Sequence, residues 1–143
     1  MDQNNKKDKY KIYLLTFTLD LCLVLILLLQ KLDLKDKIFI NLVLLTHIVF
    51  IYSLMNEKYI IAHYIHYTVY IYILLSLIMN NIYLLGVNLF LIIVIQILWM
   101  IENQCILNKV VNNYIFGYGQ ELAVASKIIT LILFFKIIYK IMS

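Results

Sequence analysis

The chain carries little charge for its size. Only 14% of its 143 residues are charged, whereas roughly a quarter are charged in soluble domains. The mean hydropathy of +0.92 is also far from that of a soluble protein, so the composition excludes a soluble globular domain. The net charge of +4 lies in tails and loops, and no basic patch is interleaved with aromatic residues. A nucleic-acid-binding surface is therefore excluded as well.

Proline is absent, glycine occurs three times, and all twelve basic residues are lysine. Isoleucine, leucine, asparagine and tyrosine are abundant instead. We interpret this bias as the codon usage of a very AT-rich genome, such as that of an organelle, a large virus, a parasite or an AT-rich bacterium. Organelle inner membranes, viral membranes and bacterial membranes are all compatible with this interpretation.

The two cysteines are not expected to form a disulfide. Cys22 lies near the middle of the first apolar stretch, and Cys105 lies beyond the end of the fourth. Their depths differ by more than the roughly 7 Å between Cα atoms that a disulfide can span. Two free thiols are the expectation, and they indicate no particular redox compartment.

Long apolar stretches dominate the chain. Each is long enough, at about 1.5 Å rise per residue, to cross a hydrocarbon core of about 30 Å. Short polar connections force neighbouring helices to run antiparallel. The sequence therefore predicts an all-α, polytopic integral membrane helical bundle. Its four clearest spans, of 18 to 20 residues with Asp20 as their single formal charge, are Ile12–Leu29, Ile38–Met55, Ile60–Met79 and Ile82–Ile101.

The two ends of the chain are less regular. Residues 1–11 are predicted to be a polar, disordered tail, and residues 12–143 a single transmembrane domain. The first apolar run resembles a secretory signal, but it lacks a small-residue cleavage pattern and is expected to remain as an anchor. The last apolar segment, residues 122–142, contains three lysines. We expect it to be a fifth span whose lysines snorkel, with a surface-lying helix as the alternative.

Six polar residues lie inside the predicted spans, where a polar side chain is costly unless it has a hydrogen-bond partner. Asp20 and His47 sit at the midpoints of adjacent spans and are predicted to form a buried hydrogen-bonded pair. His63, His66 and Tyr67 share one face of the third span because they are three and four residues apart. His66 lies about 5 Å from the midplane, and Gln96 of the fourth span lies about 7 Å from it on the same side.

These six residues admit two interpretations. They are candidates for a proton or cation pathway, because buried carboxylates and imidazoles exchange protons once water reaches them. The alternative, which we favour, is that they hydrogen-bond across helices and fix their register. Beyond the midplane the second span offers Asn41 and the fourth offers Asn88, neither of which titrates, so just half of a pathway is visible.

Metal, haem and covalent catalysis find little support. His63 and His66 supply two of the three or four ligands that zinc needs, and bis-histidine haem would require His47 to face His66. Cys22 has no base beside it, and the loops lack paired carboxylates. We therefore predict no catalytic residue, metal or cofactor.

The expected function follows from this composition. The first hypothesis is a non-enzymatic structural or accessory subunit of a larger membrane complex, with the lipid bilayer and other membrane subunits as partners and no nucleic acid. The alternative is a small proton or cation conductor or transporter that uses Asp20, His47 and His66.

Overall fold

The computed structural model describes residues 3–102, Val110 and residues 119–143. In this part of the chain the structure is all helical, without strands, which agrees with the predicted fold class. The five helices described are α1 (Gln3–Leu29), α2 (Leu34–Met55), α3 (Tyr59–Ser76), α4 (Ile82–Glu102) and α6 (Gly119–Met142).

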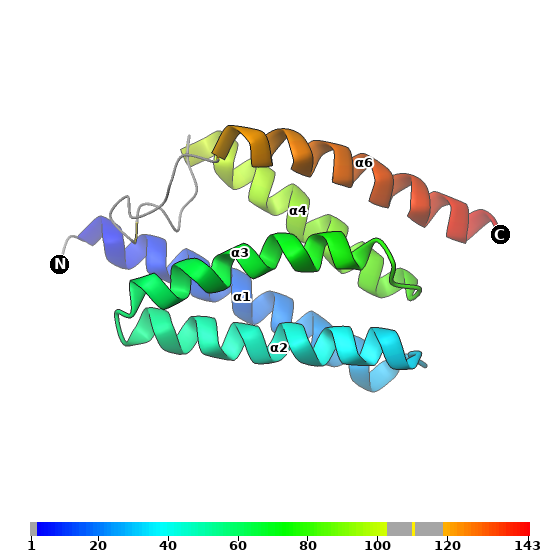
Figure 1. Cartoon of the computed structure of the whole chain (residues 1–143), viewed down its shortest axis with the longest axis horizontal. Coiled ribbons are helices and arrows are strands. Elements are labelled where there is room, and N and C mark those ends of the chain that lie inside the picture. Colours follow the sequence, from blue (N-terminus) through cyan, green and yellow to red (C-terminus); the bar gives the residue numbers. More distant parts are fainter. Residues whose placement is uncertain (1–2, 103–109, 111–118) are drawn as a thin grey trace.

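Successive helices alternate in direction along the long axis of the molecule (Figure 1). The N-terminus and the α2–α3 connection lie at one end, which we call the N-terminal end. The α1–α2 and α3–α4 connections and the C-terminus lie at the other, the C-terminal end. Helix α6 packs along α4 and runs antiparallel to it.

Helices α1 to α4 are long and apolar enough to cross a membrane. Within them the qualifying segments are Lys6–Leu29, Leu34–Met55, Tyr59–Ser76 and Ile82–Glu102. These correspond to the four apolar stretches of the sequence. Membrane insertion is inferred from this length and composition, because an apolar helix of such length satisfies its own backbone hydrogen bonds in hydrocarbon.

The polar N-terminus differs from its prediction as a disordered tail, because α1 begins at Gln3. Two ion pairs attach its first turns to the rest of the bundle. The Lys11 ammonium donates to Glu102 at the end of α4 at 2.7 Å. The Lys9 ammonium lies 3.6 Å from the Glu57 carboxylate in the α2–α3 connection. The expectation of disorder for residues 3–11 was therefore wrong.

Two other boundaries differ from the apolar stretches. Helix α2 begins at Leu34, four residues before Ile38, because the Asp33 side chain caps it by accepting a hydrogen bond from the Asp36 N–H at 2.8 Å. Helix α3 ends at Ser76. In residues 77–79, each backbone N–H donates to the carbonyl three residues earlier. The α1–α2 connection is thus shorter, and the α3–α4 connection longer, than expected.

The core lies between the helices, and the outward faces are apolar too. The largest cluster of buried apolar residues joins side chains from all five helices and includes Leu23, Ile40, Ile73, Leu85, Ile92 and Leu133. Large apolar side chains are also exposed on every helix, among them Phe17, Ile48, Ile71, Phe90 and Phe135. Contiguous apolar surface of this kind is rare on soluble monomers and marks a membrane or a partner protein.

Candidate functional site

Asp20 of α1 and His47 of α2 form a hydrogen-bonded pair in the middle of the bundle. The Nδ1 atom of His47 lies 2.5 Å from Oδ1 of Asp20. His47 is only 8% exposed, and the Asp20 side chain is 20% exposed. The donor in this contact depends on the tautomer of the ring; against an ionised carboxylate, which only accepts hydrogen bonds, the donor is Nδ1. The predicted contact between these residues is confirmed.

Hydroxyl groups flank this pair, and the contact between Thr46 and Tyr72 joins α2 to α3. The Thr46 hydroxyl donates to the Leu42 carbonyl at 2.8 Å and lies 2.6 Å from the Tyr72 hydroxyl. The Thr16 hydroxyl donates to the carbonyl of Ile12 at 2.9 Å. Tyr72 was not singled out from the sequence, although a phenol in a long apolar helix usually finds a hydrogen-bond partner.

A cavity of about 130 Å³ borders His47 on the N-terminal side of the pair. Its lining comes from all five helices and is mostly apolar. Leu15, Ile65, Val69, Ile92, Ile95 and Trp99 are among the apolar lining residues, and the polar ones are Lys11, Thr16, Thr46, His47, His66, Tyr70 and Ser126. A smaller void of about 20 Å³ borders His47 on the other side and reaches Asn88.

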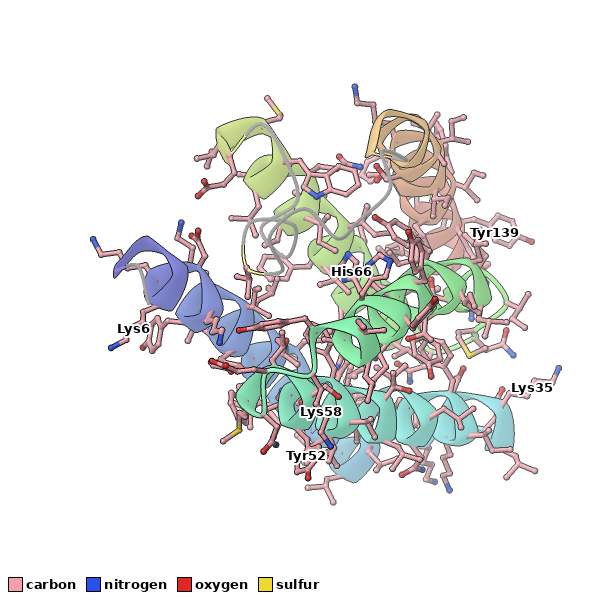
Figure 2. The ribbon with its side chains drawn as sticks, turned by 60° about the vertical axis from the view of Figure 1, so that its left-hand side comes forward. Lys6, Lys35, Tyr52, Lys58, His66 and Tyr139 are labelled. Atoms are coloured by element: carbon pink, nitrogen blue, oxygen red, sulfur yellow. The ribbon has the colours of Figure 1, made fainter. Side chains whose placement is uncertain are left out.

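Only part of the predicted polar stripe on α3 reaches this cavity. His66 lines it, and Figure 2 shows this side chain projecting from α3 toward α4. His63 and Tyr67 do not line it; their rings pack edge to face with centroids 4.9 Å apart. Within the described residues, Nδ1 of His63 is buried without a hydrogen-bond partner. The structure therefore places His47, which bonds to Asp20, and His66 on the lining of one cavity, and His63 and Tyr67 are not part of that lining.

Gln96 joins α4 to α6. Its side-chain amide donates to the Ser126 hydroxyl at 3.2 Å and to the Thr130 hydroxyl at 2.9 Å. Leu133, one turn further along α6, is fully buried. Gln96 thus fixes a helix contact, which is the structural role that we favoured for it.

A second polar cluster, which sequence reasoning missed, lies at the C-terminal end. Asp36 is 2% exposed, and its carboxylate accepts the backbone N–H groups of Asn80 at 3.2 Å and Asn81 at 3.0 Å. Asp33 accepts from the Asn80 side chain at 3.1 Å. The Asp36 backbone N–H, together with Asn80, holds the pKa of Asp33 below its usual value.

Two lysines of α6 complete this cluster, which we call the C-terminal junction: Asp33, Asp36, Asn80, Asn81, Lys136 and Lys140. The Lys136 ammonium donates to the carbonyls of Leu77 and Met79, the latter at 2.7 Å, and Lys140 donates to the carbonyl of Asn80. Carbonyls after a helix end lack intrahelical donors. A sequence signal did exist, because Asp33 stands three residues before Asp36 in the pattern of a helix N-cap.

No group of three or more His, Cys, Asp or Glu residues that could hold a metal ion occurs in the ranges that the structure describes. Cys22 is a free, half-buried thiol there. Cys105 lies outside the described residues.

Comparison of the chain with protein-family models, curated proteins and solved structures finds no match. Function must therefore be argued from the residues themselves.

Proposed function

We propose that the protein is a non-enzymatic structural or accessory subunit of a larger membrane complex. The supporting observation is how little of each helix this chain covers. In the apolar windows of α1 to α4, only 17% to 39% of residues are buried inside the chain. Helices associate in membranes through such surfaces, by close packing and occasional polar contacts.

The polar side chains support the same role because they hold the chain's own helices together. Asp20 bonds to His47, Gln96 to Ser126 and Thr130, and Asp36 to the α3–α4 connection. These contacts make a scaffold with a defined shape and an apolar exterior. Such a scaffold can pack against other membrane subunits without a reactive group of its own.

We further propose that α6 is a fifth span, which places the two termini on opposite sides of the membrane. Helix α6 runs antiparallel to α4 rather than across the bundle (Figure 1). Leu133 belongs to the common core, and Lys136 reaches the C-terminal junction. Lysines close to a helix end can bring their charge to the membrane interface.

The alternative, a proton or cation conductor, has one observation in its favour. His47 borders a cavity that extends on the N-terminal side as far as Lys11. On the other side of His47, however, the small void is lined by apolar residues, Tyr72 and Asn88. These lining residues do not form a continuous series of titratable groups across the bundle.

Purification of the native protein under mild detergent conditions tests the subunit role. A photo-crosslinking residue is placed at the outward positions Phe90 and Phe135, which are 62% and 59% exposed. Matched controls carry it at the buried positions Ile92 and Leu133. We expect crosslinks to other membrane proteins in stoichiometric amounts from the outward positions only. A lone oligomer that conducts protons after reconstitution into liposomes would contradict the subunit role and favour the alternative.

A further inference from the structure

One ring nitrogen of His47 is left available beside the cavity. Its Nδ1 is engaged by Asp20, and its Nε2 has no hydrogen-bond partner in the part of the chain that the structure describes. The ring borders the cavity of about 130 Å³. His47 therefore offers one open hydrogen-bonding position there.

The other polar groups around the cavity already have partners. Thr16 and Thr46 donate to backbone carbonyls of their own helices. Lys11 pairs with Glu102, and Ser126 accepts from Gln96. The hydrogens of Thr16 and Thr46 and the charge of Lys11 are thus engaged elsewhere, and His66, Tyr70 and Ser126, which also line the cavity, each have an interaction partner.

The apolar walls around His47 make this part of the cavity a poor host for water. A buried water typically makes about three hydrogen bonds, and an apolar cavity of about 150 Å³ stays dry and binds benzene. The present cavity has a similar volume and mostly apolar walls. Phe50 and Trp99 add aromatic surface to the lining, which favours edge or stacking contacts with a ring.

We propose that this cavity binds a neutral, phenol-sized compound that carries one hydroxyl group, with the hydroxyl hydrogen-bonded to Nε2 of His47. A neutral imidazole with its hydrogen on Nδ1 accepts a hydrogen bond at Nε2, whereas a protonated ring donates there. A hydroxyl serves both states because it donates and accepts. A ketone or ether only accepts. This ligand site is independent of the subunit role proposed above.

The test uses the full chain in lipid nanodiscs and fluorine NMR with three probes: 4-fluorophenol, 4-fluoroanisole and fluorobenzene. We expect saturable binding of 4-fluorophenol, about three- to tenfold tighter than of 4-fluoroanisole, which is the range of one hydrogen bond. Empty nanodiscs provide the correction for partition into lipid.

Two variants separate the hydrogen bond from the cavity. His47→Asn keeps a donor toward Asp20 but removes Nε2, so it should abolish the preference for the hydroxyl. Ile95→Phe fills the cavity and should abolish saturable binding of all three probes. Ile97→Phe makes the same change on the same helix at a position that is 49% exposed, and it should bind like the wild type. Leu98→Phe replaces Ile95→Phe if that variant loses helicity.

Several outcomes would overturn the proposal. If the wild type shows no saturable binding of 4-fluorophenol, the proposal is wrong, and no variant is needed to show it. Binding that Ile95→Phe leaves unchanged would place the probes elsewhere. Equal affinities for 4-fluorophenol and 4-fluoroanisole would remove the hydrogen bond to His47.

Discussion

At the scale of single residues, the bundle pairs polar groups that would be costly alone in hydrocarbon. An unpaired carboxylate at the centre of a span costs about 2.5–3.5 kcal/mol on insertion scales. Asp20 has the imidazole of His47 at 2.5 Å, and buried Asp36 has two backbone N–H groups. Each contact joins two segments of the chain, so stability and helix register depend on the same atoms.

A double-mutant cycle on Asp20 and His47 measures this dependence. Asp20→Asn keeps an acceptor and should change the free energy of unfolding by less than about 1 kcal/mol, whereas His47→Leu should cost about 1–3 kcal/mol by leaving the carboxylate without its partner. The double variant Asp20→Leu with His47→Leu should recover much of that loss. Reversible unfolding in mixed micelles gives the values. Additive losses would mean that the two side chains do not interact.

Sequence reasoning predicted the Asp20 and His47 pair because depth and adjacency follow from counting along two helices joined by a short loop. It could not predict which way each helix is rotated. For that reason Gln96, placed by depth on a pathway, faces Ser126 and Thr130 instead. Asp36 lies before the predicted start of the second span at Ile38, so its burial against the α3–α4 connection could not be foreseen.

At the scale of elements, helix ends were harder to predict than helix interiors. The apolar stretches gave the helices, but the polar caps at Asp33 and Asn81 determine where α2 and α4 begin. The Asn81 side chain accepts from the N–H groups of Tyr83 at 3.0 Å and Leu84 at 3.1 Å. Helix α6 was the most uncertain element because its three lysines match both a span and a surface helix.

The attachment of α6 to the C-terminal junction is tested by Lys136→Met. Methionine keeps the apolar stem but leaves the carbonyls of Leu77 and Met79 without their donor. We expect a loss of about 1–3 kcal/mol and faster hydrogen exchange in the second half of α6. Lys127→Met on the same helix is the control, since Lys127 is exposed. Equal exchange rates in the two variants would show that Lys136 does not anchor α6.

At the scale of the whole molecule, the alternation of helices follows from short connections and was predictable from the sequence. The packing of the fifth helix was not, because it depends on Gln96 and Lys136, which lie far from their partners in sequence. Our central proposal is that α6 joins the four apolar helices in crossing the membrane, with the N-terminal end on one side and the C-terminal end on the other.

Cysteine accessibility tests this claim most directly. In a Cys22→Ala, Cys105→Ala background, single cysteines replace Asn5, Lys35, Lys58 and Ser143, and intact vesicles are labelled with a membrane-impermeant maleimide. Five spans predict that positions 5 and 58 label from one side and positions 35 and 143 from the other. Labelling of position 143 from the same side as position 5 would contradict the fifth span, and labelling of positions 5 and 35 from the same side would contradict the bundle itself.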